Sequence, residues 1–318
     1  MKLLRNISIF VLVFGILVIV LAKRRTEESG PLSDSVTVNI SRGVSSQVVA
    51  DVLYTNNVIS NDLLFRALLK YHKVESKIKA GEYKFNAGIS MVDVMNKLIK
   101  GDVIYHKLTI PEGYTVGQVL YLLGMNDKLS GEYEYIPDEG MMLPETYTFQ
   151  KDESRNTIIR KSVSAMQDKL KEIWDARDSD LPYKNMNELL IMASIIEKET
   201  SVDEERALVA SVFVNRLRKG MRLQTDPTVI YALTEGKEEL KRLLTRKDLL
   251  IDSKYNTYKY AGLPPTPICN PGEASIYAAA HPEESEFIYF VANGKGGHNF
   301  AKTLQEHNRN VRNWKQSK

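Results

Sequence analysis

Residues 189–200 read Leu-Leu-Ile-Met-Ala-Ser-Ile-Ile-Glu-Lys-Glu-Thr, an apolar run that ends in two acidic residues. Together with the residues from Met186 on, this run predicts a helix that is buried on most of its faces. A helix of this kind forms the core of a domain, because other elements must pack around it. The stretch therefore predicts a helix-rich domain in this half of the chain, with Glu197 at the buried end of the helix.

Glu197 has two interpretations at this point. Leaving an ionised carboxylate without solvent costs several kcal/mol, so such a group either finds hydrogen-bond partners or keeps its proton. A carboxylic acid that is protonated near neutral pH is what a general acid requires. In the alternative interpretation, Glu197 is a solvated residue of the last turn or pairs with Lys198 or Arg206.

Glu199 does not supply a second carboxylate facing Glu197. Two residues along a helix correspond to a rotation of about 200°, so the two side chains point to opposite sides if the helix continues. A glycosidase that uses two carboxylates needs its second acid elsewhere. The candidates are Glu139, Glu145 and Asp226. Asp226 also suits the N-cap of a helix whose first turn contains Pro227.

The composition indicates a globular protein. The chain has 318 residues, 43% of them hydrophobic and 26% charged, which is enough for two domains of ordinary size. The net charge is +3 and no basic stripe with interleaved aromatic residues occurs, which argues against a nucleic-acid partner. The histidines show no metal-ligand spacing, so a metal site is not expected. Cys269 is the single cysteine, so no intramolecular disulfide can form.

Residues 1–25 differ from the rest of the chain. Residues 7–22 carry no charge and would span about 24 Å as a helix, slightly less than a bilayer core. Basic residues lie on both sides of this run, so the positive-inside rule leaves its orientation undecided. A cleaved signal peptide is the alternative, but the apolar run is long for one. We expect an uncleaved transmembrane anchor.

Residues 26–36 are polar, and we expect them to form a flexible linker. One pattern then occurs three times: Gly-x-Ser/Thr followed by Val and Leu at four-residue intervals. The copies start at Gly43, Gly88 and Gly113. Each predicts a loop, an N-cap and a short helix, because Ser and Thr cap helices and residues four apart share a face. Strand candidates lie near residues 36–40, 83–85 and 105–110. Residues 37–124 therefore predict a small α+β subdomain.

Residues 125–318 predict a mixed, helix-rich domain. Helices are expected at residues 156–175, 186–196, 201–220, 226 onward, 271–280 (with Asn270 as the cap) and 302–314, with a strand at 287–292. Ser201 and Glu204 have the spacing of a capping box, and Gly220 is a natural residue to follow a helix end. The fold class predicted for the whole chain is α+β.

Several segments together resemble the YceG-like family of endolytic murein transglycosylases. They are Ala193–Thr200, Val212–Leu217, Met221–Thr228, Tyr255–Tyr258, Gly262–Pro265, Ala279–Pro282 and Tyr289–Ala292. Their order and spacing fit the family from about residue 37 to residue 315. The resemblance implies a single-pass inner-membrane anchor with a cytoplasmic N-terminus, a LysM-like subdomain at 37–124 and a catalytic domain at 125–318 on the outer, periplasmic side.

The resemblance also implies an activity. The family cleaves the β-1,4 bond between N-acetylmuramic acid and N-acetylglucosamine inside nascent glycan strands, leaves a 1,6-anhydro-muramyl end and uses no metal or cofactor. Its catalytic glutamate falls on Glu197. One protonated carboxyl would donate to the glycosidic oxygen and then take the proton of the muramyl C6 hydroxyl. Peptidoglycan synthases are further partners implied at the level of the family, with a role in ending glycan elongation.

The residues that assist Glu197 are hypotheses. Five are proposed to hold the N-acetyl groups, orient Glu197 or line the cleft: Gln224, Thr225, Asn256, Tyr258 and His298. Glu145 stands in a Pro-Glu-Thr-Tyr segment where the family has Asp, so the acid is kept on a longer arm. Two rival functions stay open at this point: a hydrolytic muramidase with a second carboxylate, and a non-catalytic, membrane-tethered protein that binds peptidoglycan.

Overall fold

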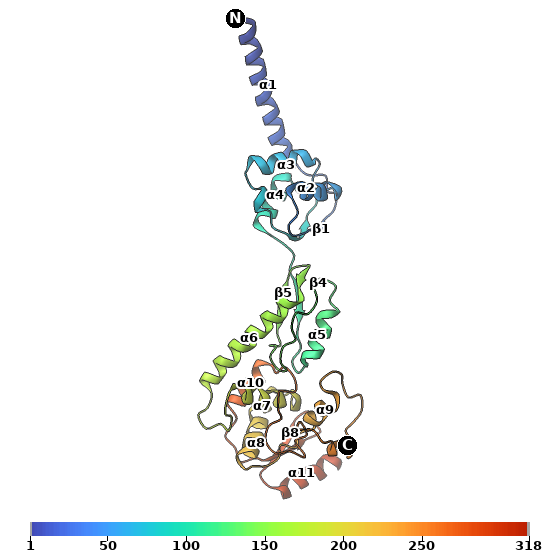
Figure 1. The fold of residues 1–318 in the computed structure, drawn as a ribbon, viewed down its shortest axis with the longest axis vertical. Helices are drawn as coiled ribbons and strands as arrows, with labels where there is room; N and C mark the ends of the chain where they lie inside the picture. Colours follow the sequence, from blue (N-terminus) through green and yellow to red (C-terminus); the bar gives the residue numbers. More distant parts are fainter. Residues whose placement is uncertain (1, 317–318) are drawn as a thin grey trace. The chain divides into compact units, whose positions relative to one another are not determined.

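The computed structural model describes residues 2–316 and shows a mixed α+β protein, which confirms the predicted fold class (Figure 1). The chain forms two compact units. The first contains the residues up to His106 together with Thr148–Lys151, and the second contains Lys107–Tyr147 and the residues from Asp152 on. The boundary that we predicted between residues 124 and 125 lies inside the second unit.

The first unit packs short helices against one pair of strands. Its elements are α1 (Lys2–Glu27), β1 (Val36–Ile40), α2 (Ser46–Thr55), α3 (Asp62–Tyr71), the 3-10 turn η1 (Glu75–Lys77), β2 (Gly81–Phe85) and α4 (Met91–Lys100). β1 and β2 are antiparallel, with Val36 opposite Phe85 and Ile40 opposite Gly81. The predicted α+β character of this region is confirmed, whereas its likeness to LysM stays a prediction.

All three copies of the repeated pattern form capped helices. Ser45, Ser90 and Thr115 each accept a hydrogen bond from the backbone N–H three residues on. The Val and Leu of every copy are buried. The third helix, α5 (Val116–Gly124), nevertheless belongs to the second unit, because the N–H of Val116 donates to Glu139 at 2.8 Å and the hydroxyl of Thr115 donates to the carbonyl of Gly236. Similar local sequence thus serves two different cores.

The linker at residues 26–36 is not the free tether that we predicted. α1 continues to Glu27, and Gly30 donates to the carbonyl of Gly88 at 3.2 Å. Gly88 in turn donates to the carbonyl of Leu32 at 2.9 Å. A side chain at position 30 would collide with the carbonyl of Ile89, so the glycine permits this close approach of two backbones.

α1 fits the expected membrane span in length and composition. The most apolar 18-residue window within Leu4–Glu27 has a mean hydropathy of 2.6, and none of that window is buried. At about 1.5 Å per residue, a helix of this length exceeds a hydrocarbon core of about 30 Å. A signal sequence near an N-terminus has the same properties, so the uncleaved anchor and its orientation stay predictions.

The second unit carries most of the helices. Besides α5 it contains β4 (Leu129–Ser130), β6 (Glu153–Ser154), α6 (Arg155–Ala176), α7 (Met186–Glu199), η2 (Asp203–Glu205), α8 (Arg206–Arg218), α9 (Asp226–Thr234), η3 (Asp248–Leu250), α10 (Glu273–Ala280), β7 (Tyr289–Ala292), β8 (His298–Ala301) and α11 (Leu304–Gln316). β7 and β8 form an antiparallel hairpin, and β4 pairs with β6 in parallel. Two further strands, β3 (His106–Thr109) and β5 (Thr146–Phe149), form a third two-stranded sheet.

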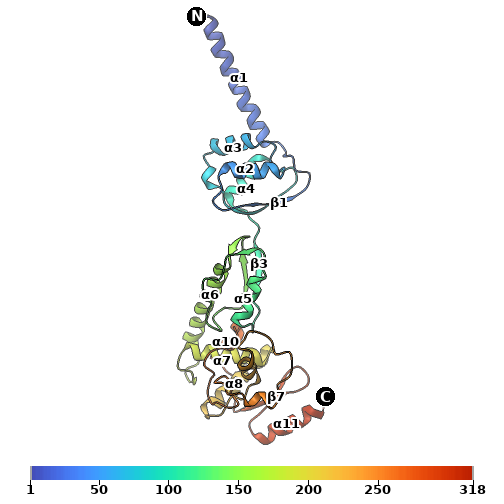
Figure 2. The same ribbon diagram turned by 45° about the vertical axis from the view of Figure 1, so that its right-hand side comes forward.

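α7 is the central helix of this unit, as residues 189–200 predict. Every residue from Leu189 to Ile196 is buried. α7 packs against α6, α8 and α10, which lie around it in Figures 1 and 2. Asn185 caps the helix by accepting a hydrogen bond from the N–H of Glu188 at 3.0 Å. The buried run ends at Ile196, which leaves the last turn at the edge of the core.

Three helix starts differ from the prediction. The helix α10 begins at Glu273 with Gly272 as its N-cap, and not at Pro271 after Asn270. α8 begins at Arg206 rather than near Ser201, and no side-chain cap precedes it, so the predicted capping box is wrong. The N–H of Val202 donates to Thr200 instead. In α9 the N-cap is Thr225, and Asp226 is the first helical residue. The predicted helix end at Gly220 is confirmed, since Gly220 follows the C-cap of α8 with a φ of 64°.

Candidate active site around Glu197

Glu197 lies in the last turn of α7 and is partly exposed, in contrast to the buried residues that precede it. Its Oε2 accepts a hydrogen bond from the N–H of Gly272 at 2.9 Å. Gly272 is the N-cap of α10, so the carboxyl group lies at the positive end of that helix. The carboxyl therefore has one fixed oxygen, while no hydrogen bond from another residue of 2–316 holds Oε1.

The ion pairs of the alternative interpretation do not form. The Nζ of Lys198 donates to the carbonyl of Gly113 at 3.3 Å, and Arg206 pairs with Asp203. Among the described residues, no salt bridge involves Glu197. The carboxyl of Glu197 is therefore not neutralised by a neighbouring cation and is available to react.

A loop from a distant part of the sequence lies beside Glu197. The Cγ of Glu197 is 3.8 Å from where a Cβ atom at Gly113 would be. The next residue toward the N-terminus, Glu112, has its carboxyl group against the α-carbon of Gly272. Although Glu112 is exposed overall, desolvation raises the pKa of its carboxyl group, the charge of Glu197 raises it further, and Arg206 opposes both.

Sequence reasoning missed Glu112. Gly113 was recognised only as the first residue of a repeated pattern, and a single acid in a loop has no periodicity that would mark it. Its Pro-Glu-Gly context, directly before a helix cap, is the signal that could have been followed.

Glu199 lies on the other side of the same helix turn, as the helical rotation predicts. Its Oε1 accepts a hydrogen bond from the hydroxyl of Thr225. Burial raises the pKa of Glu199, the Thr225 bond opposes this, the charge of Asp226 raises it, and His298 and Arg216 lower it. The predicted site residues Thr225 and His298 therefore lie around Glu199, and neither has a hydrogen bond to Glu197.

Three further predicted site residues, Gln224, Asn256 and Tyr258, have no hydrogen bond to Glu197 in the described chain. The hydroxyl of Tyr258 donates to Asp226 at 2.7 Å. Asn256 is fully buried, and its amide group donates to the carbonyls of Leu249 and Ile251 at 3.0 and 2.9 Å. Its side-chain oxygen accepts from the N–H of Tyr258, so the whole side chain is used inside the loop. Gln224 is exposed and has a positive φ of 50°.

His298 and Glu145 do not join Glu197. The Nδ1 of His298 lies 2.7 Å from Glu205, the residue before α8. Glu145 is exposed, and its side chain accepts from the N–H of Thr146 at 3.3 Å. Of the proposed second acids, Glu139 is held by Val116 and Tyr231, and burial raises its pKa.

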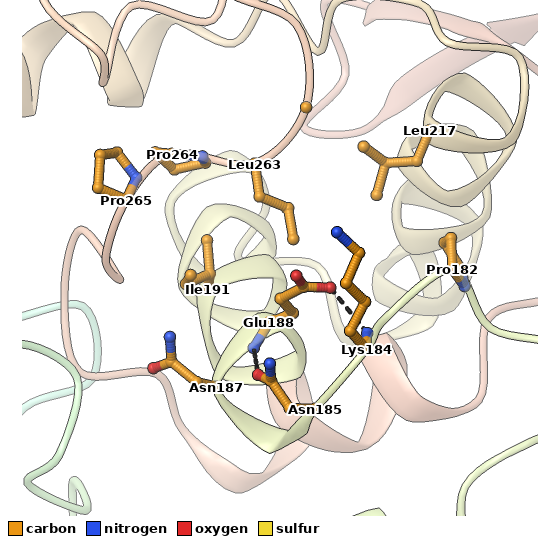
Figure 3. Close-up of a pocket in the computed structure, with 11 residues that line it drawn as sticks. Pro182, Lys184, Asn185, Asn187, Glu188, Ile191, Leu217, Leu263, Pro264 and Pro265 are labelled. Atoms are coloured by element: carbon orange, nitrogen blue, oxygen red, sulfur yellow. Dashed lines mark hydrogen bonds between the residues drawn. The ribbon is translucent and has the colours of Figure 1, made fainter.

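A separate open pocket lies at the other end of α7 (Figure 3). Its volume is about 460 Å³, and its lining includes Lys184, Glu188 and the Pro264-Pro265 pair. Glu188 and Glu197 are nine residues apart, which corresponds to about 13 Å along a helix. None of the predicted site residues lines this pocket. Among residues 2–316, no group of three His, Cys, Asp or Glu side chains could hold a metal ion.

A partly exposed carboxyl at the end of a buried helix, on a chain with an apolar N-terminal helix, is consistent with a membrane-attached glycan-cleaving enzyme. The YceG-like family matches residues 38–313, and the chain belongs to this family.

Curated relatives and a solved structure agree with this assignment. The chain is 34% identical over 308 residues to an endolytic murein transglycosylase of Bacillus subtilis, covering 86% of this chain and 83% of that protein. It is 30% identical over 324 residues to the endolytic murein transglycosylase of Streptococcus pneumoniae D39, but spans only 58% of its length. A crystal structure of a YceG-like protein of Listeria monocytogenes is 35% identical, with a TM-score of 0.53, and the match covers 87% of this chain and 98% of that one.

Proposed function

We propose that this chain is a lytic murein transglycosylase in which Glu197 is the catalytic acid and base. The observation that carries the proposal is the Glu197 carboxyl, partly exposed at the end of a buried helix and bonded through one oxygen to the N–H of Gly272 at 2.9 Å. The relatives named endolytic murein transglycosylases support the substrate, which is the glycan of peptidoglycan.

The proposed reaction needs one proton and no water. Because Gly272 occupies Oε2, Oε1 of Glu197 carries the proton and donates it to the glycosidic oxygen as the bond from the muramyl anomeric carbon breaks. The resulting carboxylate takes the proton of the muramyl C6 hydroxyl, whose oxygen attacks the anomeric carbon. The products are a free 4-hydroxyl on the leaving sugar and a 1,6-anhydro-muramyl end, and Glu197 is protonated again. Exclusion of water favours this outcome over hydrolysis.

The position of the enzyme in the cell follows from α1. With α1 as an uncleaved anchor and the N-terminus in the cytoplasm, the second unit would reach nascent strands outside the membrane. There it would shorten or terminate strands beside the synthases that extend them. The first unit would either bind glycan or act as a spacer that sets the distance of the site from the membrane.

The test is product analysis with the full-length chain in detergent micelles and uncross-linked glycan strands. Mass spectrometry should find ends that are lighter than reducing ends by one water. Glu197→Gln should lower the rate by about 10²- to 10⁴-fold, since a positioned acid contributes that much. Glu284→Gln, an isosteric change of an exposed acid outside the predicted site, is the control and should leave the rate unchanged.

Two results would contradict the proposal. Reducing ends, which carry the added water, would indicate a muramidase. A muramidase needs a second carboxylate, and Glu112 beside Glu197 could supply it. Cleavage by Glu197→Gln at the wild-type rate would show that the site is elsewhere. If neither protein cleaved glycan but both bound it, the non-catalytic binding function would be supported instead.

A further inference from the structure

The loop that carries Glu112 is fastened to the loop before α10. The N–H of Gly113 donates to the carbonyl of Asn270 at 3.0 Å, and the N–H of Asn270 donates to the carbonyl of Tyr114 at 2.8 Å. The side chain of Asn270 is fully buried and donates to the same Tyr114 carbonyl at 2.8 Å. Its oxygen accepts from the N–H of Met142 at 2.9 Å. These hydrogen bonds hold the loop of Glu112 in place next to Gly272.

The backbone conformation of Gly272 does not require a glycine. Its φ is −72°, a value open to any residue. A Cβ atom at this position would instead collide with the carboxyl group of Glu112. The same glycine donates its N–H to Glu197. Gly272 thus contacts two carboxyl groups. Its N–H binds Glu197, and the carboxyl of Glu112 fills the space that a side chain at this position would occupy.

The charged groups beside Glu112 come from two helices. Glu197 is on α7, and Arg206, whose side chain is 8% exposed, is on α8. Lys198 reaches the carbonyl of Gly113, next to Glu112. The Nε of Arg206 is buried and has no hydrogen-bond partner among residues 2–316. The carboxyl of Glu112 accepts no hydrogen bond from the described residues, and Arg206 offsets part of the rise in its pKa.

We propose that Glu112 is a positioning residue for the reaction proposed above: its carboxyl, seated against the α-carbon of Gly272, places a negative charge beside the Glu197 carboxyl and so favours the acid form that the reaction uses. The inference rests on the proposed function. A negative charge beside a carboxyl makes its ionisation more costly, and both carboxyls here contact Gly272. The direction of the Glu112 pKa agrees with this coupling. Glu112 does not transfer the proton itself.

The pH profile of kcat tests this role in the full-length protein with glycan as substrate. Glu112→Gln removes the charge and keeps the shape, so the alkaline limb should move to lower pH. The rate should fall about tenfold above neutral pH and remain near wild type in acid. Glu112→Asp should restore part of the alkaline limb. An alkaline limb that stays in place in Glu112→Gln, or an equal loss at every pH, would overturn the inference.

Gly272→Ala provides an independent test, because it adds only the Cβ atom that displaces the Glu112 carboxyl. It should lower the rate in the wild type but add little in a Glu112→Ala background, where the space is free. Gly117→Ala is the matched control, since a Cβ there meets only ordinary contacts, the nearest at 3.6 Å. Equal losses from Gly272→Ala in both backgrounds would show that the substitution acts on Glu197 directly and would contradict the role of Glu112.

The product itself separates this inference from the proposed function. If the wild type leaves anhydro ends and Glu197→Gln does not cleave, an unchanged profile in Glu112→Gln overturns only the role of Glu112. If the wild type leaves reducing ends that depend on Glu112, then Glu112 activates water and both proposals are wrong.

Discussion

At the scale of residues, two acids only two positions apart have different surroundings. Glu197 faces the loops of Glu112 and Gly272, and Glu199 faces Thr225 and His298. Because of the helical rotation between them, the carboxyl of Glu197 has one oxygen without a hydrogen bond from the described residues, whereas the carboxyl of Glu199 is buried. Enclosure without a full ion pair makes the charged form of Glu199 costly.

The enclosed acid predicts a pH dependence of stability. The folded pKa of Glu199 is raised, mainly by burial. Its stabilising contribution is therefore fully present below the unfolded pKa of about 4.3 and is lost as the pH rises through the folded value. Urea unfolding of the full-length chain should show the free energy of unfolding falling across this window, and Glu199→Gln should flatten the fall.

Tryptophan fluorescence makes this measurement specific, because the two tryptophans, Trp174 and Trp314, both belong to the second unit. Glu145→Gln, which alters an exposed acid, should leave the slope as in the wild type. A slope that is the same in wild type and Glu199→Gln would mean that Glu199 is not the group responsible.

At the scale of elements, α7 connects the core to the site. Its buried run packs on three helices, and the last turn emerges where the packing stops. The position of Glu197 is thus determined by how far the apolar face of α7 is covered. The capped helices show the complementary point, since α5 forms by the same local rules as α2 and α4 but packs in the other unit.

The packing of α7 predicts a large effect for a single truncation. Leu190 is 1% exposed, so Leu190→Ala should lower the free energy of unfolding by about 2 to 5 kcal/mol through lost burial and a cavity. Leu243 is 90% exposed, and Leu243→Ala should change it by less than about 0.5 kcal/mol. Tryptophan-detected urea unfolding compares them, and similar losses in the two variants would argue against α7 as the core.

At the scale of the whole molecule, the chain forms two compact units, and the apolar helix α1 belongs to the first of them. α1 is apolar on all sides and none of its most apolar window is buried, which suits a lipid environment and not a water-exposed surface. The proposed membrane anchor and the proposed catalytic site thus reside in separate parts of the chain.

This separation predicts the effect of removing α1. A chain that starts after Glu27 should stay in the soluble fraction, whereas the full-length protein should sediment with membranes and resist extraction by salt. Both should leave anhydro ends on glycan in solution, because α1 belongs to the first unit and Glu197 to the second. Sequencing of the N-terminus of the mature full-length protein is the decisive control, and a terminus beyond residue 22 would show a cleaved signal peptide.

The sequence by itself determined what depends on neighbours along the chain. Helix periodicity identified α7 and its terminal acids, and short-range capping rules identified Ser45, Ser90 and Thr115. The apolar character of residues 7–22 needs no partner either. These features could be predicted because hydrogen bonds and side-chain stacking within about four residues largely determine them.

Only the tertiary structure decided which residues surround Glu197. Glu112 reaches it through Asn270, which is far away in the sequence, and the predicted partners Thr225 and His298 lie around Glu199 instead. It also placed the third repeated helix in the second unit and fastened the linker to Gly88. Contacts of this kind depend on where distant segments pack, and no local pattern encodes that, because the energy comes from burying surfaces that many partners could cover.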